Sequence, residues 1–236
     1  MPDIAIRNLI KIYKTGHTEV LALREVKLDV GSGEMVTILG PSGCGKSTLL
    51  NMIAGLDRPN AGSIVVDGQN IVELNETALA GYRRTGVGVV FQFFNLVPTL
   101  SARENIELPM RLEGTGGRER RERTEELLKL VKMAGRAEHL PDELSGGEQQ
   151  RIAIAVALAN DPPLMLADEP TGELDSKTGR EVLDIFRRMK EEQRKTLIIV
   201  THDERIANIA DRTVRMMDGQ IVDDRPNPAL PPAPSS

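Results

Sequence analysis

A glycine-rich segment near residue 40 has the residue types and the spacing of a phosphate-binding loop. The segment reads Gly40-Pro41-Ser42-Gly43-Cys44-Gly45-Lys46-Ser47-Thr48 and fits Gly-x-x-x-x-Gly-Lys-[Ser/Thr]. Glycines let backbone N–H groups turn toward phosphate oxygens, and the N-terminus of a following helix adds partial positive charge. We expect Lys46 to reach the β- and γ-phosphates of a nucleotide and the Ser47 hydroxyl to ligate Mg²⁺. The other expected nucleotide-binding residues here are Gly40, Ser42, Gly43, Cys44, Gly45 and Thr48.

The sequence on either side of this loop predicts the structural context that the motif requires. Residues 35–39, Met-Val-Thr-Ile-Leu, are apolar and partly β-branched, which indicates a buried strand. Residues 48–54 have the apolar spacing of a helix, and Gly55 marks its expected end. A chance glycine-rich turn is the alternative, but strand, loop and helix in this order favour a nucleotide site.

Two carboxylates, Asp168 and Glu169, directly follow an apolar run at residues 164–167. A carboxylate at the end of a strand beside a phosphate-binding loop can hold Mg²⁺, and we assign this role to Asp168. Neighbouring strand residues point to opposite sides, so Glu169 is aimed differently and could act as the general base that polarises an attacking water. The alternative is an ordinary acidic turn that closes a strand.

A second candidate anion site lies at residues 144–151, Leu-Ser-Gly-Gly-Glu-Gln-Gln-Arg. Ser145 is a good N-cap residue for the helix expected after it, and Gly146 and Gly147 would let a phosphate approach the backbone closely. A simple capped helix is the alternative. Because the chain already has one phosphate site, a second one needs a separate purpose.

Composition and charge restrict the class of protein. The 236 residues are 40% hydrophobic and 28% charged, which is ordinary for a soluble globular protein. The net charge of −5 argues against a nucleic-acid partner, because a phosphate backbone requires a basic face. The sequence has neither the apolar run of a membrane span nor the pattern of a signal peptide, and its single cysteine excludes an internal disulfide. We therefore expect a cytoplasmic protein.

The remaining pattern predicts an α/β protein with a parallel sheet. Strands are expected at 4–6, 21–23, 26–30, 35–39, 63–68, 86–91, 163–167 and 196–200. A helix at about 177–192 lies between the last two strands, and such β-α-β alternation implies parallel pairing. Residues 100–160 are helical in pattern, and the Arg/Glu-rich start of 118–133 favours a solvated helix face over a binding patch. Residues 226–236 are rich in Pro, Ala and Ser and are expected to form a disordered tail.

Taken together, the motifs resemble those of the nucleotide-binding subunits of ATP-binding-cassette (ABC) transporters. Leu-Ser-Gly-Gly-x-Gln at 144–149, the phosphate-binding loop and Asp168-Glu169 occur in the family's order, and the resemblance spans residues 3–222. It implies an ATPase that converts ATP and water to ADP and phosphate. It also implies a homodimer that sandwiches two ATP molecules head to tail, in which Ser145, Gly146 and Gly147 act in trans on the γ-phosphate of the ATP held by the other copy.

The same resemblance assigns further residues by position. Tyr13 resembles the aromatic residue that stacks on adenine, and Gln92 resembles the glutamine that senses Mg²⁺ and the attacking water. Asp175 resembles the aspartate that links the two sites in trans, and His202 resembles the histidine that contacts the γ-phosphate. As alternatives, Tyr13 could be a surface tyrosine and His202 a structural histidine. The expected catalytic residues are Lys46, Gln92, Glu169 and His202, and the expected Mg²⁺ ligands are Ser47, Gln92 and Asp168.

Residues 91–106 and 55–59 look like the branch of the family that serves macrolide export and lipoprotein release. The resemblance implies a P-loop NTPase core with an N-terminal antiparallel β portion. We expect a single ABC ATPase domain at 1–225, with a helical subdomain at about 93–160. One departure is Glu173, where the branch usually has Asn or Ala, because it places a negative charge near the expected dimer interface.

An integral membrane permease subunit is the partner that the resemblance implies, and it would hold the chain at the inner face of the cell membrane. Residues 93–109 are rich in apolar side chains and follow Gln92, so they are the expected docking surface, although Phe94 and Leu96 could belong to the core instead. Cys44 is interpreted as a small space-filling residue, and we expect modification of its thiol to obstruct ATP.

Three other functions stay open. A mechanical or DNA-repair ABC protein usually carries long coiled coils or zinc-binding inserts, and this sequence has neither heptad runs nor paired cysteines. A regulatory module that binds nucleotide without turnover is the second, and the intact Glu169 argues against it. The third is an ABC ATPase that drives a cell-envelope process without moving a solute, and the sequence is compatible with it.

Overall fold

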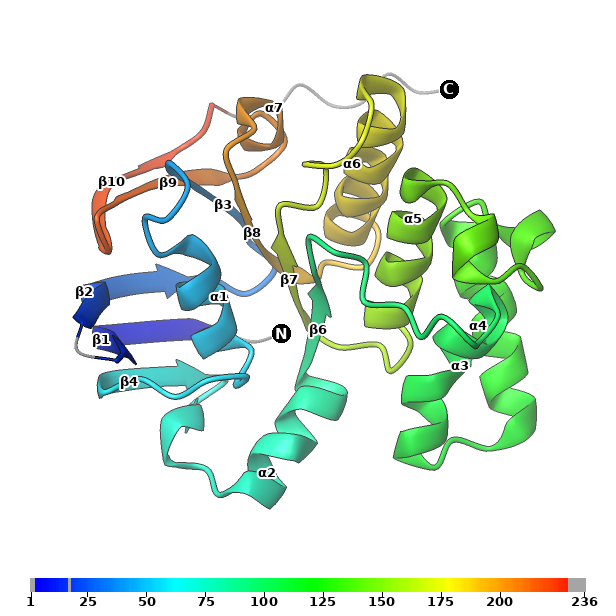
Figure 1. The fold of residues 1–236 in the computed structure, drawn as a ribbon, viewed down its shortest axis with the longest axis horizontal. Coiled ribbons are helices and arrows are strands. Elements are labelled where there is room, and N and C mark those ends of the chain that lie inside the picture. The colour runs from blue at the N-terminus through cyan, green and yellow to red at the C-terminus, as the bar shows by residue number, and fades with distance from the viewer. Residues whose placement is uncertain (1–2, 17, 229–236) are drawn as a thin grey trace.

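Two β-sheets and a set of helices make up the chain in a computed structural model that describes residues 3–16 and 18–228 (Figure 1). The first sheet is antiparallel, in the order β2-β1-β4-β5. Its strands are β1 (Ile4–Thr15), β2 (Thr18–Val30), β4 (Ala61–Val66) and β5 (Gln69–Asn70). The predicted antiparallel portion near the N-terminus is confirmed.

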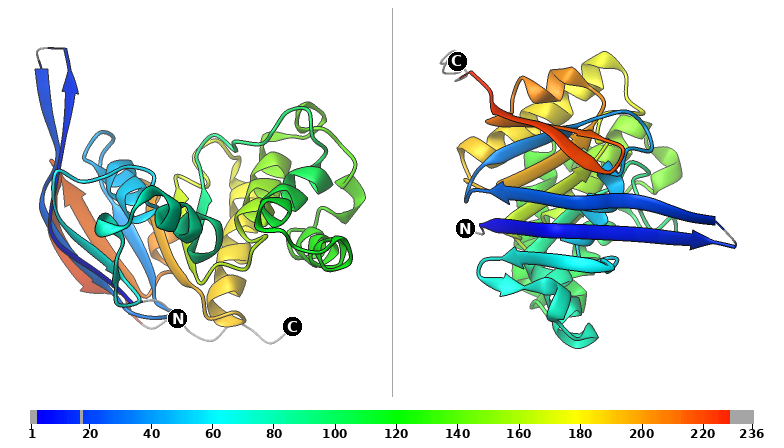
Figure 2. Two further views of the ribbon diagram at one scale, coloured as in Figure 1. Left: turned by 90° about the horizontal axis from the view of Figure 1, so that it is seen from below. Right: turned by 90° about the vertical axis from the view of Figure 1, so that its left-hand side faces the viewer.

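The first hairpin is longer than the sequence indicated. The strands expected at 21–23 and 26–30 are one strand, β2, which pairs with β1 through several register shifts. Glu25, between the two expected strands, has a φ of 51°, as a bulge in a strand can require. Figure 2 shows the outer ends of β1 and β2 extending beyond the rest of the molecule.

The second sheet has the strand order β10-β9-β3-β8-β7-β6, and only β10 is antiparallel to its neighbour. The strands are β3 (Met35–Leu39), β6 (Val87–Val90), β7 (Leu164–Asp168), β8 (Thr196–Thr201), β9 (Arg212–Met217) and β10 (Gln220–Pro226). Because alternate strand residues face opposite sides, this sheet divides two cores. Val36, Leu166 and Ile198 face the core shared with the antiparallel sheet, whereas Met35, Met165 and Ile199 face the core shared with helices.

The longer helices lie in the segments that the sequence predicted to be helical. They are α1 (Lys46–Ile53), α3 (Ala102–Glu113), α4 (Gly117–Leu130), α5 (Gly146–Ala157) and α6 (Ser176–Glu191). The shorter ones are α2 (Glu76–Gly81), α7 (Glu204–Ala207), a π-helical turn at Tyr82–Gly86, and 3₁₀ turns at Ile71–Glu73, Ala134–Arg136 and Pro141–Glu143. Buried residues of α1 pack in the core between the two sheets, and α3, α4 and α5 gather on the other side of the larger sheet (Figure 1).

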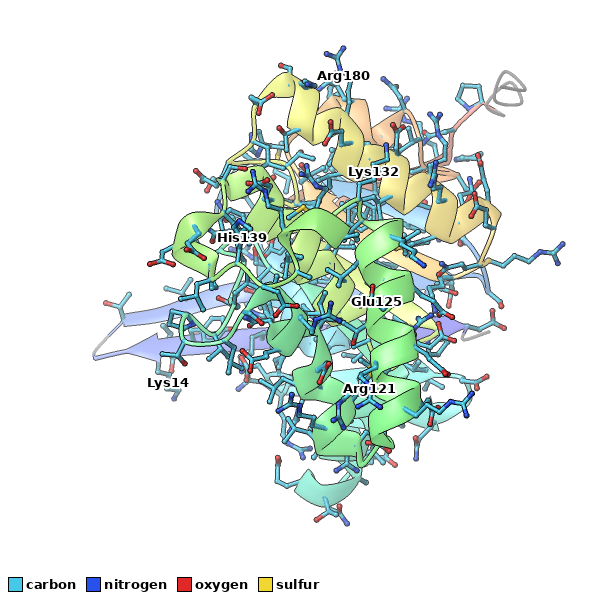
Figure 3. All side chains as sticks on the ribbon, turned by 90° about the vertical axis from the view of Figure 1, so that its right-hand side faces the viewer. Lys14, Arg121, Glu125, Lys132, His139 and Arg180 are labelled. Atoms are coloured by element: carbon cyan, nitrogen blue, oxygen red, sulfur yellow. The ribbon has the colours of Figure 1, made fainter. Side chains whose placement is uncertain are left out.

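The charged start of α4 is a solvated helix face, as the sequence favoured. Figure 3 looks onto this face, with Arg121 and Glu125 labelled along α4. Arg118 pairs with Glu122 at 2.8 Å, and Glu125 pairs with Arg103 of α3 at 2.7 Å. These ion pairs offset the positive charges of Arg118 and Arg103.

The ordered chain continues past the predicted start of the tail. Pro226 is the last residue of β10, and Asn227 donates hydrogen bonds from its side chain to the carbonyl oxygens of Ala207 at 2.8 Å and Ala210 at 3.0 Å. The rest of the predicted tail, 229–236, lies outside the described residues. Within the described ranges, no helix combines the length and the apolar character needed to cross a bilayer.

Candidate active site

Four parallel strands bring the predicted site residues to one edge of the larger sheet. In the spatial order β3-β8-β7-β6, these strands end just before Gly40, His202, Glu169 and Gln92, respectively. Parallel strands have their carboxyl ends at the same edge, which is where α/β proteins bind ligands. A cavity of about 810 Å³ lies there. Its lining includes Tyr13, Ser42, Gly43, Gly45, Lys46, Ser47, Thr48, Gln92, Glu169 and His202.

Two glycines of the loop stand where a side chain does not fit. A Cβ at Gly40 would collide with the carbonyl oxygen of Met216 in β9, and a Cβ at Gly45 would lie 2.5 Å from the carbonyl oxygen of Ala22 in β2. Gly45 also has a φ of 103°, which glycine adopts without a steric penalty. The loop is therefore packed against β2 and β9, and these contacts fix its shape.

The ammonium group of Lys46 is placed to meet an anion. Its Nζ donates to the carbonyl oxygens of Gly40 at 2.8 Å and Pro41 at 3.0 Å, and it lies 3.8 Å from Oε1 of Glu169. Helix α1 begins at Lys46. Its N-cap residue is Gly45, which has no side chain to cap the first turn. Because first-turn N–H groups have no intrahelical acceptor, they and the ammonium can bind phosphate together.

Ser47 and Asp168 form an oxygen pair beside the loop. Ser47 Oγ donates to Oδ1 of Asp168 at 3.0 Å. Burial raises the pKa of the Asp168 carboxyl, and the neighbouring negative charge of Glu169 also raises it. The hydrogen bond from Ser47 lowers the pKa and offsets part of this effect. The pair fits Mg²⁺, which prefers oxygen ligands and fills its other positions with water and phosphate oxygens. Among the described residues, no cluster of three or more His, Cys, Asp or Glu could hold a metal by itself.

Glu169 is held by groups from two other segments. Its φ is 44°, which is uncommon for a residue other than glycine, and its N–H donates to the carbonyl oxygen of Val200 in β8 at 2.9 Å. Its Oε2 accepts hydrogen bonds from Thr201 Oγ1 at 2.9 Å and from the His202 N–H at 3.2 Å. Asp168 contacts Ser47 whereas Glu169 faces Lys46 and His202, so the two adjacent carboxylates have different partners.

His202 and Gln92 lie on either side of Glu169 in the strand order. Nδ1 of His202 is 2.9 Å from Oε2 of Glu169, and the ring is otherwise well exposed. When Nδ1 carries the proton it donates to the carboxylate, which leaves Nε2 free for a second partner. Gln92 is half-buried and lines the cavity just after the end of β6.

Tyr13 lines the same cavity from β1, although it lies far from the phosphate-binding loop in the sequence. Its hydroxyl donates to Oδ2 of Asp57 at 2.9 Å, and Nζ of Lys11 lies 4.8 Å from the centre of its ring. Val20, opposite Tyr13 in the β1–β2 pair, also lines the cavity. With Tyr13 37% exposed, the ring has open surface on which a flat base could stack.

The residues expected to act in trans form a separate surface. Within the described chain, the lining of the cavity contains none of Ser145, Gly146, Gly147 and Asp175. Ser145 caps α5, where its hydroxyl donates to Oε2 of Glu148 at 2.9 Å, and Asp175 caps α6. A Cβ at Gly147 would collide with Cγ2 of Thr178 in the first turn of α6, so the two helix starts lie against each other.

Several residues at the cavity carry no motif that sequence reasoning could use. Leu21, Ala22 and Arg24 come from β2, and Asp218 and Gly219 come from the β9–β10 turn. They reach the loop only through the tertiary packing: the Gly219 N–H, for example, donates to the carbonyl oxygen of Cys44 at 2.9 Å. Thr201 was also missed, although its place directly before His202 at the end of a strand is a usable signal.

The side chain of Cys44 is buried beneath the loop, with the residue only 4% exposed. This agrees with a space-filling role, but it makes the thiol a poor target for modification in the folded protein. We expect Cys44→Ala and Cys44→Ser to bind and hydrolyse ATP, and a maleimide to label the native protein slowly and the unfolded protein rapidly. Mass spectrometry of samples labelled with and without denaturant measures this, and rapid native labelling would contradict the burial.

Three comparisons place the chain among known proteins. A sequence model of the family described as "ABC transporter" matches residues 23–172. An uncharacterized ABC transporter ATP-binding protein of Methanocaldococcus jannaschii, MJ0796, is 46% identical over 222 residues, which cover 92% of this chain and 94% of that protein. The macrolide export ATP-binding/permease protein MacB of Brucella abortus is 44% identical over 223 residues, which cover 94% of this chain and 34% of that protein.

A solved structure of the M. jannaschii protein has the same fold. It is described as the dimeric structure of a post-hydrolysis state of this ATP-binding cassette bound to ADP and Pi. The match has a TM-score of 0.90 and 43% sequence identity, and it covers 96% of this chain and 100% of that one.

Proposed function

This chain belongs to the ABC transporter family, and from that premise we propose that it hydrolyses ATP to power a separate membrane subunit. The observation that supports the proposal best is the meeting of four strand ends at one cavity. There the phosphate-binding loop, the two carboxylates, Gln92 and His202 surround a space that suits a nucleotide. We propose residues 1–225 as the ATPase unit, with 93–160 as its helical part.

Each residue of the site has a role that its geometry supports. Lys46 and the first turn of α1 bind the β- and γ-phosphates, and Glu169 accepts the proton of the attacking water. His202 and Gln92 hold the γ-phosphate and that water in place. Tyr13 stacks on the adenine. Since phosphoryl transfer depends on positioning and on charge stabilisation, the rigid contacts behind the loop and behind Glu169 are part of the catalyst.

Mg²⁺ is the metal that the oxygen pair of Ser47 and Asp168 would hold, with Gln92 as a further ligand. When bound, it would neutralise charge on the phosphates. The hydrogen bond between Ser47 and Asp168 shows that both oxygens already converge beside the loop.

Two copies of the chain would complete the site. The dimeric structure of the M. jannaschii cassette supports homodimerisation. We propose that Ser145, Gly146 and Gly147 of one copy contact the γ-phosphate held by the other, because they have no contact with the cavity of their own chain. Asp175, packed beside them at the start of α6, would link the two sites.

The membrane subunit and its task are proposed from the relatives. The similarity to a macrolide export ATP-binding/permease protein supports export or lipoprotein release as the process that ATP hydrolysis drives. The chain would then be a cytoplasmic protein held at the inner face of the membrane by its partner, with no nucleic-acid partner. A cell-envelope process without solute transport is the alternative.

A disabled chain in the source cells separates these outcomes. With Glu169→Gln on the chromosome, increased sensitivity to macrolides would support export, and lipoproteins retained in the inner membrane would support release. If both phenotypes are absent and the cells show a defect in the cell envelope, the result would support the alternative.

An apolar groove next to Gln92 is a good docking surface for the membrane subunit. Leu56, Phe91 and Pro109 are among the residues that line a groove of about 210 Å³, and Phe93, two residues after Phe91 in the chain, is 71% exposed. By contrast, Leu96 packs against the helical core, and the ring of Phe94 lies near Gly146, with its Cζ 3.6 Å from where a Cβ would be. The core interpretation is therefore favoured for Leu96, and the docking role passes to Phe93.

We expect Phe93→Asp to abolish recovery of the membrane subunit while basal ATP hydrolysis stays near the wild-type rate, because the ring contacts solvent. Val222→Asp is the matched control, since Val222 on β10 is also 60% exposed but lies at the other end of the larger sheet. Pull-downs of the tagged chain from detergent-solubilised membranes of the source cells, analysed by mass spectrometry, give the readout. Recovery of the same membrane protein with Phe93→Asp would exclude Phe93 from the interface.

A further inference from the structure

One oxygen of the Glu169 carboxylate is fully occupied by hydrogen bonds, whereas the other is not. Oε2 lies 2.9 Å from Thr201 Oγ1, 3.2 Å from the His202 N–H and 2.9 Å from His202 Nδ1. Among the residues that the structure describes, Oε1 makes no hydrogen bond, and the ammonium of Lys46 lies 3.8 Å from it, which is longer than a hydrogen bond. The two oxygens of the general base therefore differ in what they can still accept.

The hydroxyl of Thr201 is itself fixed in one orientation. Thr201 is the last residue of β8 and is fully buried. Its Oγ1 accepts a hydrogen bond from the Asp203 N–H at 3.0 Å, so the proton of the hydroxyl is directed to Glu169. A β-branched residue at a strand end has few rotamers, and this one donates from a rigid position.

We propose that Thr201 is a positioning residue that selects Oε1 of Glu169 as the atom that takes the proton from water. This rests on the proposed role of Glu169. As the water oxygen bonds to the γ-phosphorus, the bond from that phosphorus to the β–γ bridging oxygen breaks, ADP leaves, and the water proton passes to Oε1. With Oε2 held by the hydroxyl of Thr201 together with His202, the carboxylate does not rotate to present the other oxygen.

Replacing Thr201 with valine tests the proposal, because valine keeps the shape and removes the hydroxyl. We expect kcat for ATP hydrolysis to fall by roughly 10- to 100-fold, the loss typical of a misplaced catalytic group, with KM for ATP unchanged. Thr201→Ser keeps the donor and is expected to retain most of the activity. A valine variant with wild-type kcat, or a serine variant as slow as the valine one, would overturn the proposal.

Thr37→Val is the matched control for the loss of a buried hydroxyl. Thr37 lies in β3 of the same sheet, is fully buried, and its Oγ1 has no hydrogen-bond partner among the described residues. We expect this variant to hydrolyse ATP at the wild-type rate. A loss equal to that of Thr201→Val would show that the effect comes from the core of the sheet and would overturn the proposal.

Thr201→Val also leaves the Asp203 N–H without its acceptor. A test in the Glu169→Gln variant therefore separates the positioning of Glu169 from a general structural effect. Single-turnover hydrolysis is measured in Glu169→Gln with and without Thr201→Val. If Thr201 acts through the carboxylate, the added change has little effect on the residual rate, whereas an equal further loss would indicate a structural role. If Glu169→Gln itself keeps wild-type turnover, the proposed function of Glu169 fails, and that outcome is distinct from a failure confined to Thr201.

Discussion

Glu169→Gln is expected to bind ATP as well as the wild type does and to hydrolyse it roughly 10²–10⁴-fold more slowly, which is the usual contribution of a general base. Glutamine has the same shape and can still accept the hydrogen bond from Thr201 through its amide oxygen. It cannot take a proton from water. Binding should survive because the loop, Lys46 and the first turn of α1 are unchanged.

Phosphate release and binding of a fluorescent ATP analogue measure the two halves of this prediction. Glu191→Gln is the matched control, since Glu191 is exposed at the end of α6 and lies outside the cavity. Turnover of Glu169→Gln within a few-fold of the wild type would remove Glu169 from the role of base. Loss of nucleotide binding would instead show that Glu169 mainly supports the phosphate-binding loop.

Glu169→Gln with ATP is also expected to convert from monomer to dimer, and adding Ser145→Arg is expected to prevent the conversion. In the proposed sandwich, the γ-phosphate joins the two copies, and slow hydrolysis preserves it. A bulky cation at the start of α5 fills the space into which the partner's phosphate must enter. ADP should not support the dimer, because the group that the second copy contacts is missing. Size exclusion with light scattering gives the mass directly.

A milder pair of variants controls for helix stability. Ser145 and Ser101 cap α5 and α3 with the same capping box, closed by Glu148 and Glu104. Ser145→Ala and Ser101→Ala should each cost about 1 kcal/mol of helix stability, but only the first should weaken the ATP-dependent dimer. If the arginine variant dimerised as well as its parent, or if ADP served as well as ATP, the sandwich would be excluded.

Local charge should influence how tightly this dimer closes. The Ser145 hydroxyl donates to the carboxylate of Glu148, whose pKa is lowered by hydrogen bonds from the backbone and the side chain of Ser145. To reach a phosphate, the hydroxyl must leave this carboxylate. Exposed Glu173 adds negative charge close to Asp175. Since salt screens such charges, the Glu169→Gln dimer should be favoured at higher ionic strength.

Much of the candidate site could be predicted because its motifs are short and carry their own context. The phosphate-binding loop needs glycines at fixed offsets from a strand and a helix, and Asp168-Glu169 needs an apolar strand before it. Short apolar, partly β-branched runs likewise predicted most strands, since such a run is a local property of the sequence. Long-range packing decided what the sequence left open or misjudged. The choice between a core and a docking role for Leu96 was open in the sequence, and the accessibility of the Cys44 thiol was overestimated, because both depend on segments distant in the sequence.

The sequence by itself predicted the chemistry: a loop for phosphate, an oxygen pair suited to Mg²⁺, a carboxylate beside it and a second helix start that suits an anion. Only the tertiary structure decided which groups meet. The strand order β3-β8-β7-β6 places Thr201 and His202 between the loop and Glu169, although they are more than 30 residues from Glu169 and more than 150 from Lys46 in the chain. Sheet pairing at such separations is selected by the packing of the two cores on either side of the sheet, and no local pattern records it.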